Sequence, residues 1–173
     1  MEKNKIVPNA NETVLNVDDF IVSKTDTRGR ITYCNQIFIE MSEYEESELI
    51  GKNHNIIRHP NMPKIAFKLA WELIQSGKEF FGFVKNLQKH GGYYWVFTCI
   101  TPDYDKNGTI IGYTSVRRKP SQTAINTIEQ IYKQLVSIEN SGGIKASEEF
   151  LVNFLKDKNT TYDELIITLQ GVK

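Results

Sequence analysis

The sequence predicts an α+β fold in which antiparallel strands fall into two groups separated by helices. Two short segments rich in β-branched or aromatic residues lie near the N-terminus and are joined by a turn, which indicates a hairpin. Three longer segments of this kind, joined by turn-rich connections, lie between residues 79 and 118 and indicate a meander. After Pro120 the apolar residues recur every three or four positions, which predicts a helical tail.

Composition limits the class of protein before any motif is considered. The 173 residues allow one domain plus appended helices, and 21 basic residues balance 21 acidic ones. Since no basic block is present, we expect no nucleic-acid partner. Since no stretch approaches the roughly 18 consecutive apolar residues of a membrane span, we expect no direct membrane insertion. No segment resembles a signal peptide, and Cys34 and Cys99 stand outside any CxxC pattern. We therefore expect a cytoplasmic protein with reduced thiols.

The first elements expected are a polar lead, a hairpin and a capped helix. Residues 1–12 are polar and predict a mobile or weakly helical lead. Strands are expected at 20–23 and 30–33, with a turn at 26–29 between them. Asn35 can cap the next helix, because its side-chain oxygen can accept a bond from a free amide of the first turn. The apolar face of this helix comprises Ile37, Phe38 and Met41.

A longer helix is expected after the prolines at positions 60 and 63. A residue before proline favours extended geometry, so His59 should leave any helix that precedes it. Asn61 can cap the longer helix, Pro63 is tolerated in its first turn, and Gly77 ends it. Its buried stripe consists of Ala66, Leu69, Ala70, Leu73 and Ile74.

The remaining elements are three strands and a helical tail. The strands are expected at 79–87, 93–102 and 109–118. In the tail, residues 140–143 break a first amphipathic helix, Ser147 opens a second, and a capping box at Thr161 to Glu164 opens a third. The seam of the first helix comprises Ile125, Ile128, Tyr132, Leu135 and then Ile138 or Glu139. The chain thus divides into a lead at 1–12, a sensor-sized domain at 13–119 and a helical extension at 120–173.

A cluster of polar residues precedes the aromatic strands and indicates a ligand site. Two of the three histidines, His54 and His59, lie close to Arg58. Arg58 could bind a phosphate, because guanidinium offers two parallel donors, or it could be a surface arginine bound to a carboxylate. His59 could bond a ligand or hold its loop, and His54 is better explained as a capping or packing residue. This cluster suits a planar, partly polar ligand.

Asn86 and Trp71 are the other candidates for that site. Asn86 lies in an apolar strand, where asparagine is unfavourable. If it faces an interior pocket its amide needs partners there; otherwise it faces water from an edge strand. Trp71 lies off the buried stripe of its helix, one turn after Phe67. Four more aromatic residues could line the same slot or simply form the core: Phe81, Tyr93, Tyr94 and Trp95.

Several motifs resemble the flavin-binding PAS domains of the aerotaxis receptor (Aer) family, over roughly residues 12–118. They are NIIRHPNMP at 55–63, Ala66-Phe67 with Trp71, GFVKN at 82–86, YWV at 94–96 and GYTSVR at 112–117. The resemblance implies a PAS fold, in which a five-stranded antiparallel sheet carries short helices on one face. It implies FAD as cofactor and a redox or energy-taxis sensor as function. It also implies that flavin is bound by Arg58, His59, Trp71 and Asn86.

This chain departs from the family pattern at one position and differs from it in architecture. The family motif reads His-Pro-Asp where this chain has Asn61, so a neutral amide replaces a carboxylate. The absence of a membrane span is similar to soluble, CetB-like members of the energy-taxis family. That similarity implies protein–protein contact with a separate membrane-bound, methyl-accepting-chemotaxis-like receptor, which could recruit this chain to the inner membrane. A homodimer is left open.

Three other readings remain open or are disfavoured by chemistry. Light-oxygen-voltage (LOV) domains need a cysteine beside the flavin, and the alignment places His54 there, which excludes adduct chemistry. A gas sensor with haem b would use His54 or His59 as axial ligand. A cofactor-free PAS interaction module would fill its pocket with core side chains. No enzyme is expected, since no Ser/His/Asp arrangement, HExxH, P-loop or GxGxxG occurs.

Overall fold

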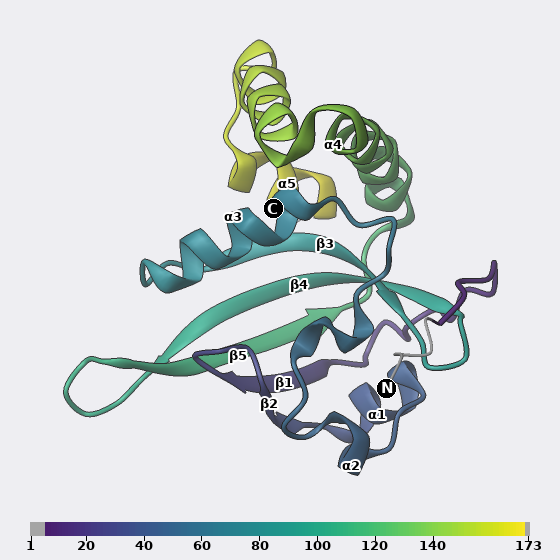
Figure 1. The fold of residues 1–173 in the computed structure, drawn as a ribbon, viewed down its shortest axis with the longest axis vertical. Coiled ribbons are helices and arrows are strands. Elements are labelled where there is room, and N and C mark those ends of the chain that lie inside the picture. The colour runs from purple at the N-terminus through teal and green to yellow at the C-terminus, as the bar shows by residue number, and fades with distance from the viewer. Residues whose placement is uncertain (1–5, 172–173) are drawn as a thin grey trace.

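The computed structural model describes residues 6–171, and one five-stranded antiparallel sheet forms its centre (Figure 1). The strands lie in the order β2-β1-β5-β4-β3, so the N-terminal hairpin pairs with the last strand of the meander. This confirms the predicted α+β class. The strands are β1 (Ile21–Asp26), β2 (Ile31–Cys34), β3 (Phe80–Leu87), β4 (Tyr93–Tyr104) and β5 (Ile110–Arg118).

Alternation along the strands gives the sheet two buried faces. On β4, Tyr94 and Val96 pack with the N-terminal helices on what we call the inner face. Trp95 and Phe97 pack with the C-terminal helices on the outer face. All four side chains are at most 5% exposed. A strand buried on both sides reads as a continuous apolar run, which is how the sequence of β4 reads.

Four helical segments lie over the inner face of the sheet, and two of them form a wall of the cavity described below. Asn35 caps the first of them as predicted, because its Oδ1 accepts a hydrogen bond from the amide of Phe38. The same side chain bonds the backbone of Phe20 and Val22, which ties this helix to β1. The segments are α1 (Gln36–Ser42), α2 (Glu46–Leu49), the 3₁₀ helix η1 (His54–Ile57) and α3 (Lys64–Gln75).

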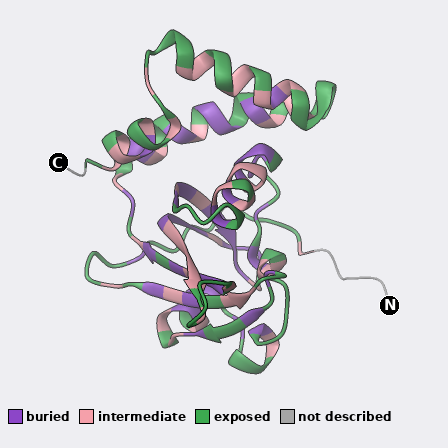
Figure 2. Cartoon of the chain, turned by 90° about the vertical axis from the view of Figure 1, so that its left-hand side faces the viewer, coloured by how far each residue is buried: buried purple, intermediate pink, exposed green. Residues whose placement is uncertain are grey.

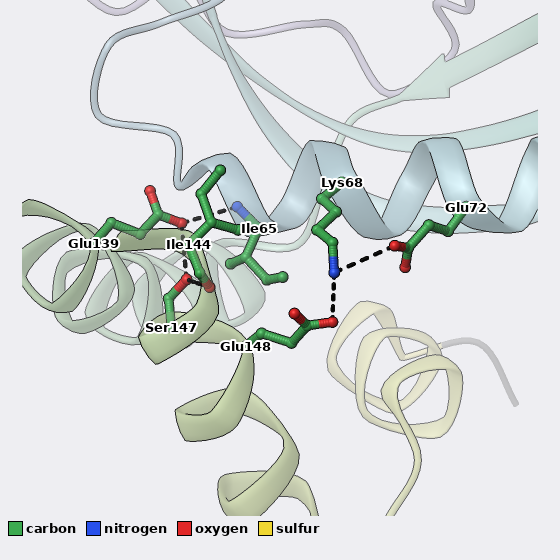
Figure 3. Close-up of polar contacts among 7 residues, drawn as sticks. All are labelled: Ile65, Lys68, Glu72, Glu139, Ile144, Ser147 and Glu148. Carbon is green, nitrogen blue, oxygen red and sulfur yellow. Dashed lines mark hydrogen bonds and ion pairs between the residues drawn. The ribbon is translucent and has the colours of Figure 1, made fainter. Parts of the chain in front are cut away.

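The N-terminus of α3 differs from the sequence prediction, because Asn61 does not cap it. Pro63 is the N-cap residue and makes no side-chain bond to the helix. Instead the carboxylate of Glu139, which lies 74 residues after Ile65, accepts a bond from the amide of Ile65 (2.9 Å, Figure 3). It also accepts a bond from the amide of Lys64 (2.8 Å). A local capping rule cannot anticipate an acceptor that comes from another helix.

The C-terminal extension forms α4 (Gln122–Asp157) and α5 (Tyr162–Gln170). The predicted break lies at Gly143, whose φ of 76° and ψ of −179° kink α4. Ser147 does not open a helix, since it lies inside α4 and is fully buried, with its hydroxyl bonded to Glu139 (Figure 3). The predicted capping box at the start of α5 is confirmed, with reciprocal bonds between Thr161 and Glu164.

The helices α4 and α5 cover the part of the outer face that β3 and β4 form. Their buried side chains pack against Trp95 and Phe97, and the hydroxyl of Tyr132 donates to the carbonyl of Phe83 (2.8 Å). Figure 2 shows that exposed and intermediate residues dominate the segment of α4 that follows the kink. The side chains that join this core are Ala124, Ile128, Ile131, Tyr132, Leu135 and Ile166.

The N-terminal lead is not helical where the structure describes it. Residues 6–13 run beside the β3–β4 hairpin, with backbone bonds from Asn9 to Gly91 and between Thr13 and Tyr93. Residues 1–5, which belong to the same predicted lead, lie outside the described residues. Among residues 6–171, no helix combines the length and the apolar character that crossing a bilayer requires.

Candidate functional site

A cavity lies between the inner face of the sheet and the helices η1 and α3. The space in it that the centre of a water-sized sphere can reach measures about 140 Å³, which is enough to hold several water molecules or part of a small ligand. Side chains from β1, β3, β4 and β5 form its floor, and those of η1, α3 and the segment between them form its walls.

The wall that α3 contributes is apolar. Phe67, Ala70, Trp71 and Ile74 recur at the three- and four-residue spacing of one helix face. Trp71 therefore lines the cavity, together with Ala70 and Ile74, which the sequence assigned to the buried stripe. Its ring packs edge-to-face on Tyr113 of β5, with 5.6 Å between ring centroids, and this contact fixes its orientation.

The opposite part of the cavity is polar and is organised by Arg117 of β5. One guanidinium nitrogen, Nη2, lies 2.7 Å from Ser23 Oγ and 2.7 Å from His54 Nε2. Ser23 Oγ and His54 Nε2 are themselves 3.0 Å apart. All three residues line the cavity, and Arg117 is only 4% exposed. They form a fixed polar cluster at its inner end.

His54 is neutral in this cluster. Burial and the neighbouring charge of Arg117 lower its pKa to about 3. Its Nε2 must then be the acceptor for Arg117, so the ring proton belongs on Nδ1. The ring also stacks on Phe38, with 5.6 Å between centroids. The structure thus places His54 both at the cavity and in the packing role that the sequence favours.

Within residues 6–171, three buried polar atoms in this region make no hydrogen bond of good geometry. They are Asn86 Nδ2, Arg117 Nη1 and Tyr94 Oη. Asn86 and Arg117 line the cavity, and Tyr94 stands opposite Asn86 in the β3–β4 register. Buried polar groups in folded proteins nearly always have a hydrogen-bond partner. Several buried polar atoms without a partner beside one cavity therefore indicate a polar ligand.

Arg58 also lines the cavity, but it is exposed and lies toward solvent. Its guanidinium stacks over the ring of Phe67 at 3.6 Å from the centroid. Its backbone forms an isolated bridge with Asn86, which holds the segment before α3 on the edge strand β3. No salt bridge to Arg58 is found among residues 6–171. The guanidinium is therefore available to an anionic ligand group.

His59 and Asn61 do not line this cavity. His59 is 2% exposed, its Nδ1 accepts a bond from the amide of Asn61, and its ring packs edge-on against Tyr93. Burial lowers its pKa to about 4. These contacts hold the loop before α3, which is one of the two roles the sequence left open. Asn61 lies at a second hollow, beside Lys85 and Glu129.

The aromatic residues of β3 and β4 do not form the cavity as a group. Phe81, Tyr93 and Trp95 pack with the outer-face core, because they occupy the strand positions that alternate away from the inner face. Tyr94 faces inward but lies within the core of the N-terminal helices. Of the aromatic residues considered for an isoalloxazine slot, Trp71 alone lines the cavity.

Ser23 and Arg117 are site residues that the sequence reasoning missed. For Arg117 the signal was the two-residue period of β5, in which Tyr113, Ser115 and Arg117 share one face. A cation at an inward position of a central strand departs strongly from normal core composition. Following that period from the aromatic Tyr113 would have identified it.

Two of the alternative chemistries find no matching side chains. Neither Cys34 nor Cys99 lines the cavity, so no thiol stands ready for a LOV-type adduct. His54 Nε2 is already bonded to Arg117, and His59 does not line the cavity. Neither histidine therefore presents a free Nε2 to the cavity as an axial ligand for haem. In residues 6–171 no group of three or more His, Cys, Asp or Glu is placed to hold a metal ion.

Comparisons with known proteins agree with this architecture. The family model described as the PAS fold matches residues 31–117. Over 123 residues, which are 71% of this chain and 24% of the relative, the chain is 39% identical to the aerotaxis receptor of Escherichia coli K12. Over 109 residues, 63% of this chain and 22% of the relative, it is 28% identical to the nitrogen fixation regulatory protein of Klebsiella pneumoniae.

The chain spans about a quarter of the length of these curated relatives. Among solved structures, one from a study of a flavin analogue in a light-oxygen-voltage domain superposes with a TM-score of 0.57. That likeness covers 66% of this chain and 86% of the other, at 22% identity, and it shows the shared fold alone.

Proposed function

The chain belongs to the PAS family, and from this premise we propose that it is a flavin-binding redox and energy-taxis sensor whose cofactor is FAD. The observation that carries the proposal is the set of orphaned polar atoms, Asn86 Nδ2 and Arg117 Nη1, at an otherwise largely apolar cavity. An isoalloxazine ring is planar and apolar on its faces, with carbonyl oxygens and ring nitrogens along its edge. It matches both properties of the cavity.

The residues that line the cavity suit different parts of such a ligand, according to their chemistry. Trp71 and Phe67 offer flat apolar surface to a ring, and Asn86 offers an amide to its edge. Arg58, exposed and without a carboxylate partner among residues 6–171, is suited to a phosphate outside the ring pocket. The similarity to the aerotaxis receptor supports a flavin, and the free guanidinium supports a phosphate-bearing one.

A haem-binding gas sensor is the second candidate considered, and the geometry does not favour it. The cavity histidine bonds Arg117, so haem binding would have to break that contact and leave the cation without its acceptor. A cofactor-free module would be expected to fill its cavity with side chains, whereas this one leaves polar atoms without partners.

We propose that the signal leaves the cavity through α3 and α4 and passes by protein contact to a separate membrane-bound chemoreceptor-like partner. Flavin would supply a redox change that alters which ring atoms donate or accept hydrogen bonds. The amide of Asn86 can present either its oxygen or its nitrogen to the cavity, at a cost of about 1–3 kcal/mol when unmatched. The backbone bridge from Asn86 to Arg58 leads to the segment that precedes α3.

Two polar contacts then join α3 to α4. Glu139 binds the first amides of α3, and Lys68 Nζ lies 2.6 Å from Glu148 and 3.3 Å from Glu72 (Figure 3). A shift of α3 would therefore change its contacts with α4 on both sides of the kink. The exposed segment after the kink is the surface that we propose for the partner.

The deciding experiment is to purify the full chain and identify what it carries. We expect a yellow protein with the absorption bands of oxidised flavin, and FAD as the compound released on denaturation. A Soret band would instead indicate haem. A colourless protein that takes up neither FAD, FMN nor riboflavin in a binding titration would overturn the proposal.

A further inference from the structure

Arg117 is a buried cation without a counter-charge. It is 4% exposed, and within residues 6–171 no salt bridge to it is found and no Asp or Glu lines the cavity. Burial lowers its pKa only to about 10, so it stays charged at neutral pH. Proteins seldom bury an unpaired charge, because transfer out of water is unfavourable without a partner. This arrangement therefore requires an explanation beyond stability.

The guanidinium is held in place by neutral groups and keeps one nitrogen free. Nη2 donates to Ser23 and His54, and the group lies 5.1 Å above the centroid of the Phe38 ring. Nη1 is buried and has no partner. An arginine fixed on one side and unsatisfied on the other presents a pre-oriented donor to a ligand.

The other titratable groups at this end of the cavity do not cancel the charge. His54 is neutral above a pKa of about 3. Burial raises the pKa of Tyr94 and of Tyr113, so both phenols stay neutral. Arg58, at the exposed part of the cavity, adds a second positive charge. Two cations thus border the cavity, Arg117 buried and Arg58 exposed, together with the apolar side chains of α3.

We propose that Arg117 is the residue that selects the ligand ring: it donates to a carbonyl oxygen of an imide-like edge, while Arg58 serves the phosphate. The ligand class is a planar heteroaromatic ring with a carbonyl-bearing edge. This inference deepens the flavin-binding function proposed above and rests on it. It assigns the two cations to different groups of one molecule, because they border the same cavity while Arg117 on β5 is buried and Arg58, before α3, is exposed.

The proposal has an unusual consequence for stability. In the empty domain Arg117 destabilises the fold, since it is a buried charge without a partner. Replacing it by methionine leaves Ser23 and His54 bonded to each other at 3.0 Å, so no new orphan is created. Arg117→Met should therefore raise the melting temperature of the ligand-free protein and reduce the increase that a ligand produces. A purely structural arginine would show the opposite sign in the ligand-free protein.

The test measures the affinity of four flavins for three proteins. Lumiflavin and riboflavin carry the ring without phosphate, and FMN and FAD carry it with phosphate. Arg117→Met should weaken all four at least tenfold relative to wild type, because all share the ring edge. Arg58→Met is the matched control, and it should weaken only FMN and FAD. Infrared spectra of bound flavin should show a ring-carbonyl band that moves to higher wavenumber in Arg117→Met and not in Arg58→Met.

Each result decides the matter. Unchanged affinity of Arg117→Met for all four flavins, or a loss confined to FMN and FAD, would overturn the assignment. Should Arg117→Met not fold, Arg117→Lys, which keeps the charge but not the fork of donors, must still shift the carbonyl band. A wild-type band in that variant overturns the proposal. If wild-type protein binds none of the four flavins, the proposed function itself fails, which separates that failure from this one.

Discussion

Asn86 and Arg117 are polar at inward positions of strands whose other inward residues are apolar or small. Val84 precedes Asn86 on the same face of β3, and Tyr113 and Ser115 precede Arg117 on β5. Both side chains keep one nitrogen without a partner. At the scale of single residues, two polar side chains at inward positions give this largely apolar face of the sheet hydrogen-bonding groups beside the cavity.

Replacing Asn86 by alanine should weaken flavin binding. The amide is the polar group on β3 that faces the cavity, and losing a buried hydrogen bond costs about 1–3 kcal/mol, or roughly 5- to 150-fold in affinity. Fluorescence titration with FAD measures the effect. Asn153→Ala, on the exposed surface of α4, is the matched control and should bind like wild type. Equal affinity of both variants would refute the assignment of Asn86.

The stability of the ligand-free protein should fall with pH below the ordinary pKa of histidine. His54 has a folded-state pKa of about 3 against 6.5 when unfolded, so the unfolded chain binds more protons between those values. Stability is therefore full above about pH 6.5 and decreases toward acid, by up to about 1.4 kcal/mol per pH unit for one such group. His59 adds to the slope, since its pKa is lowered to about 4.

Urea unfolding between about pH 5 and 7 tests this linkage above the range where carboxylates titrate. His54→Gln and His59→Gln should each remove part of the slope, and the double variant most of it. His90→Gln is the control, because the side chain of His90 makes no hydrogen bond and no ion pair among residues 6–171. A slope that survives in the double variant would show that other groups carry it.

Some of the site could be read from sequence and some could not, for identifiable reasons. Trp71 and Asn86 were found because each breaks the pattern of its own element, and such breaks are visible in one sequence. His59 and Asn61 were grouped with Arg58 because they are neighbours in sequence. The prolines turn the chain there, so His59 points into the loop while Arg58 borders the cavity. Side-chain direction in an irregular segment does not follow from spacing.

At the scale of elements, the junction of α3 and α4 depends on one carboxylate. Glu139 binds two amides at the start of α3 and also accepts a bond from the buried hydroxyl of Ser147 (Figure 3). A negative charge at a helix N-terminus is favourable, because the free amides and the helix dipole both attract it. Glu139, which lies before the kink, thus holds the start of α3 in place. It also holds the turn of α4 that follows the kink.

Glu139→Gln should loosen this junction. The amide keeps the shape and one acceptor but loses the charge, so we expect a loss of about 0.5–2 kcal/mol. Hydrogen exchange at the amides of Lys64 and Ile65 should accelerate, because they lose their charged acceptor. Glu149→Gln is the control, since Glu149 is exposed and makes no ion pair in the described structure. Unchanged exchange at both amides would mean that the cap does not stabilise the junction.

Elements were predicted better than their ends. Hairpins, the capped α1 and the capping box of α5 depend on residues within a few positions, so local rules identify them. The start of α3 and the course of α4 through Ser147 depend on Glu139 and on packing against the sheet. Those contacts span long separations in the sequence, and local patterns contain no information about them.

At the scale of the whole molecule, the sheet and the C-terminal helices share one core. Leu135 and Ile166 are at most 1% exposed and belong to the same cluster as Phe83, Trp95 and Phe97 of the sheet. The outer faces of β3 and β4 therefore have no alternative cover in the described structure. An extension of this kind is an integral part of the fold, although the change of pattern at Pro120 marks it as a separate segment of sequence.

The chain should consequently unfold in one cooperative transition, with equal calorimetric and van't Hoff enthalpies. Leu135→Ala should lower the stability of the whole molecule by about 2–5 kcal/mol, because it opens a cavity between α4 and the sheet. Val152→Ala, at a side chain 58% exposed in the same helix, should change it little. If Leu135→Ala instead produced an early, separate transition that left the sheet and its cavity intact, the extension would be an independent unit. A redox signal could then not travel from cavity to α4 through a shared core, and a flexible tether would have to carry it.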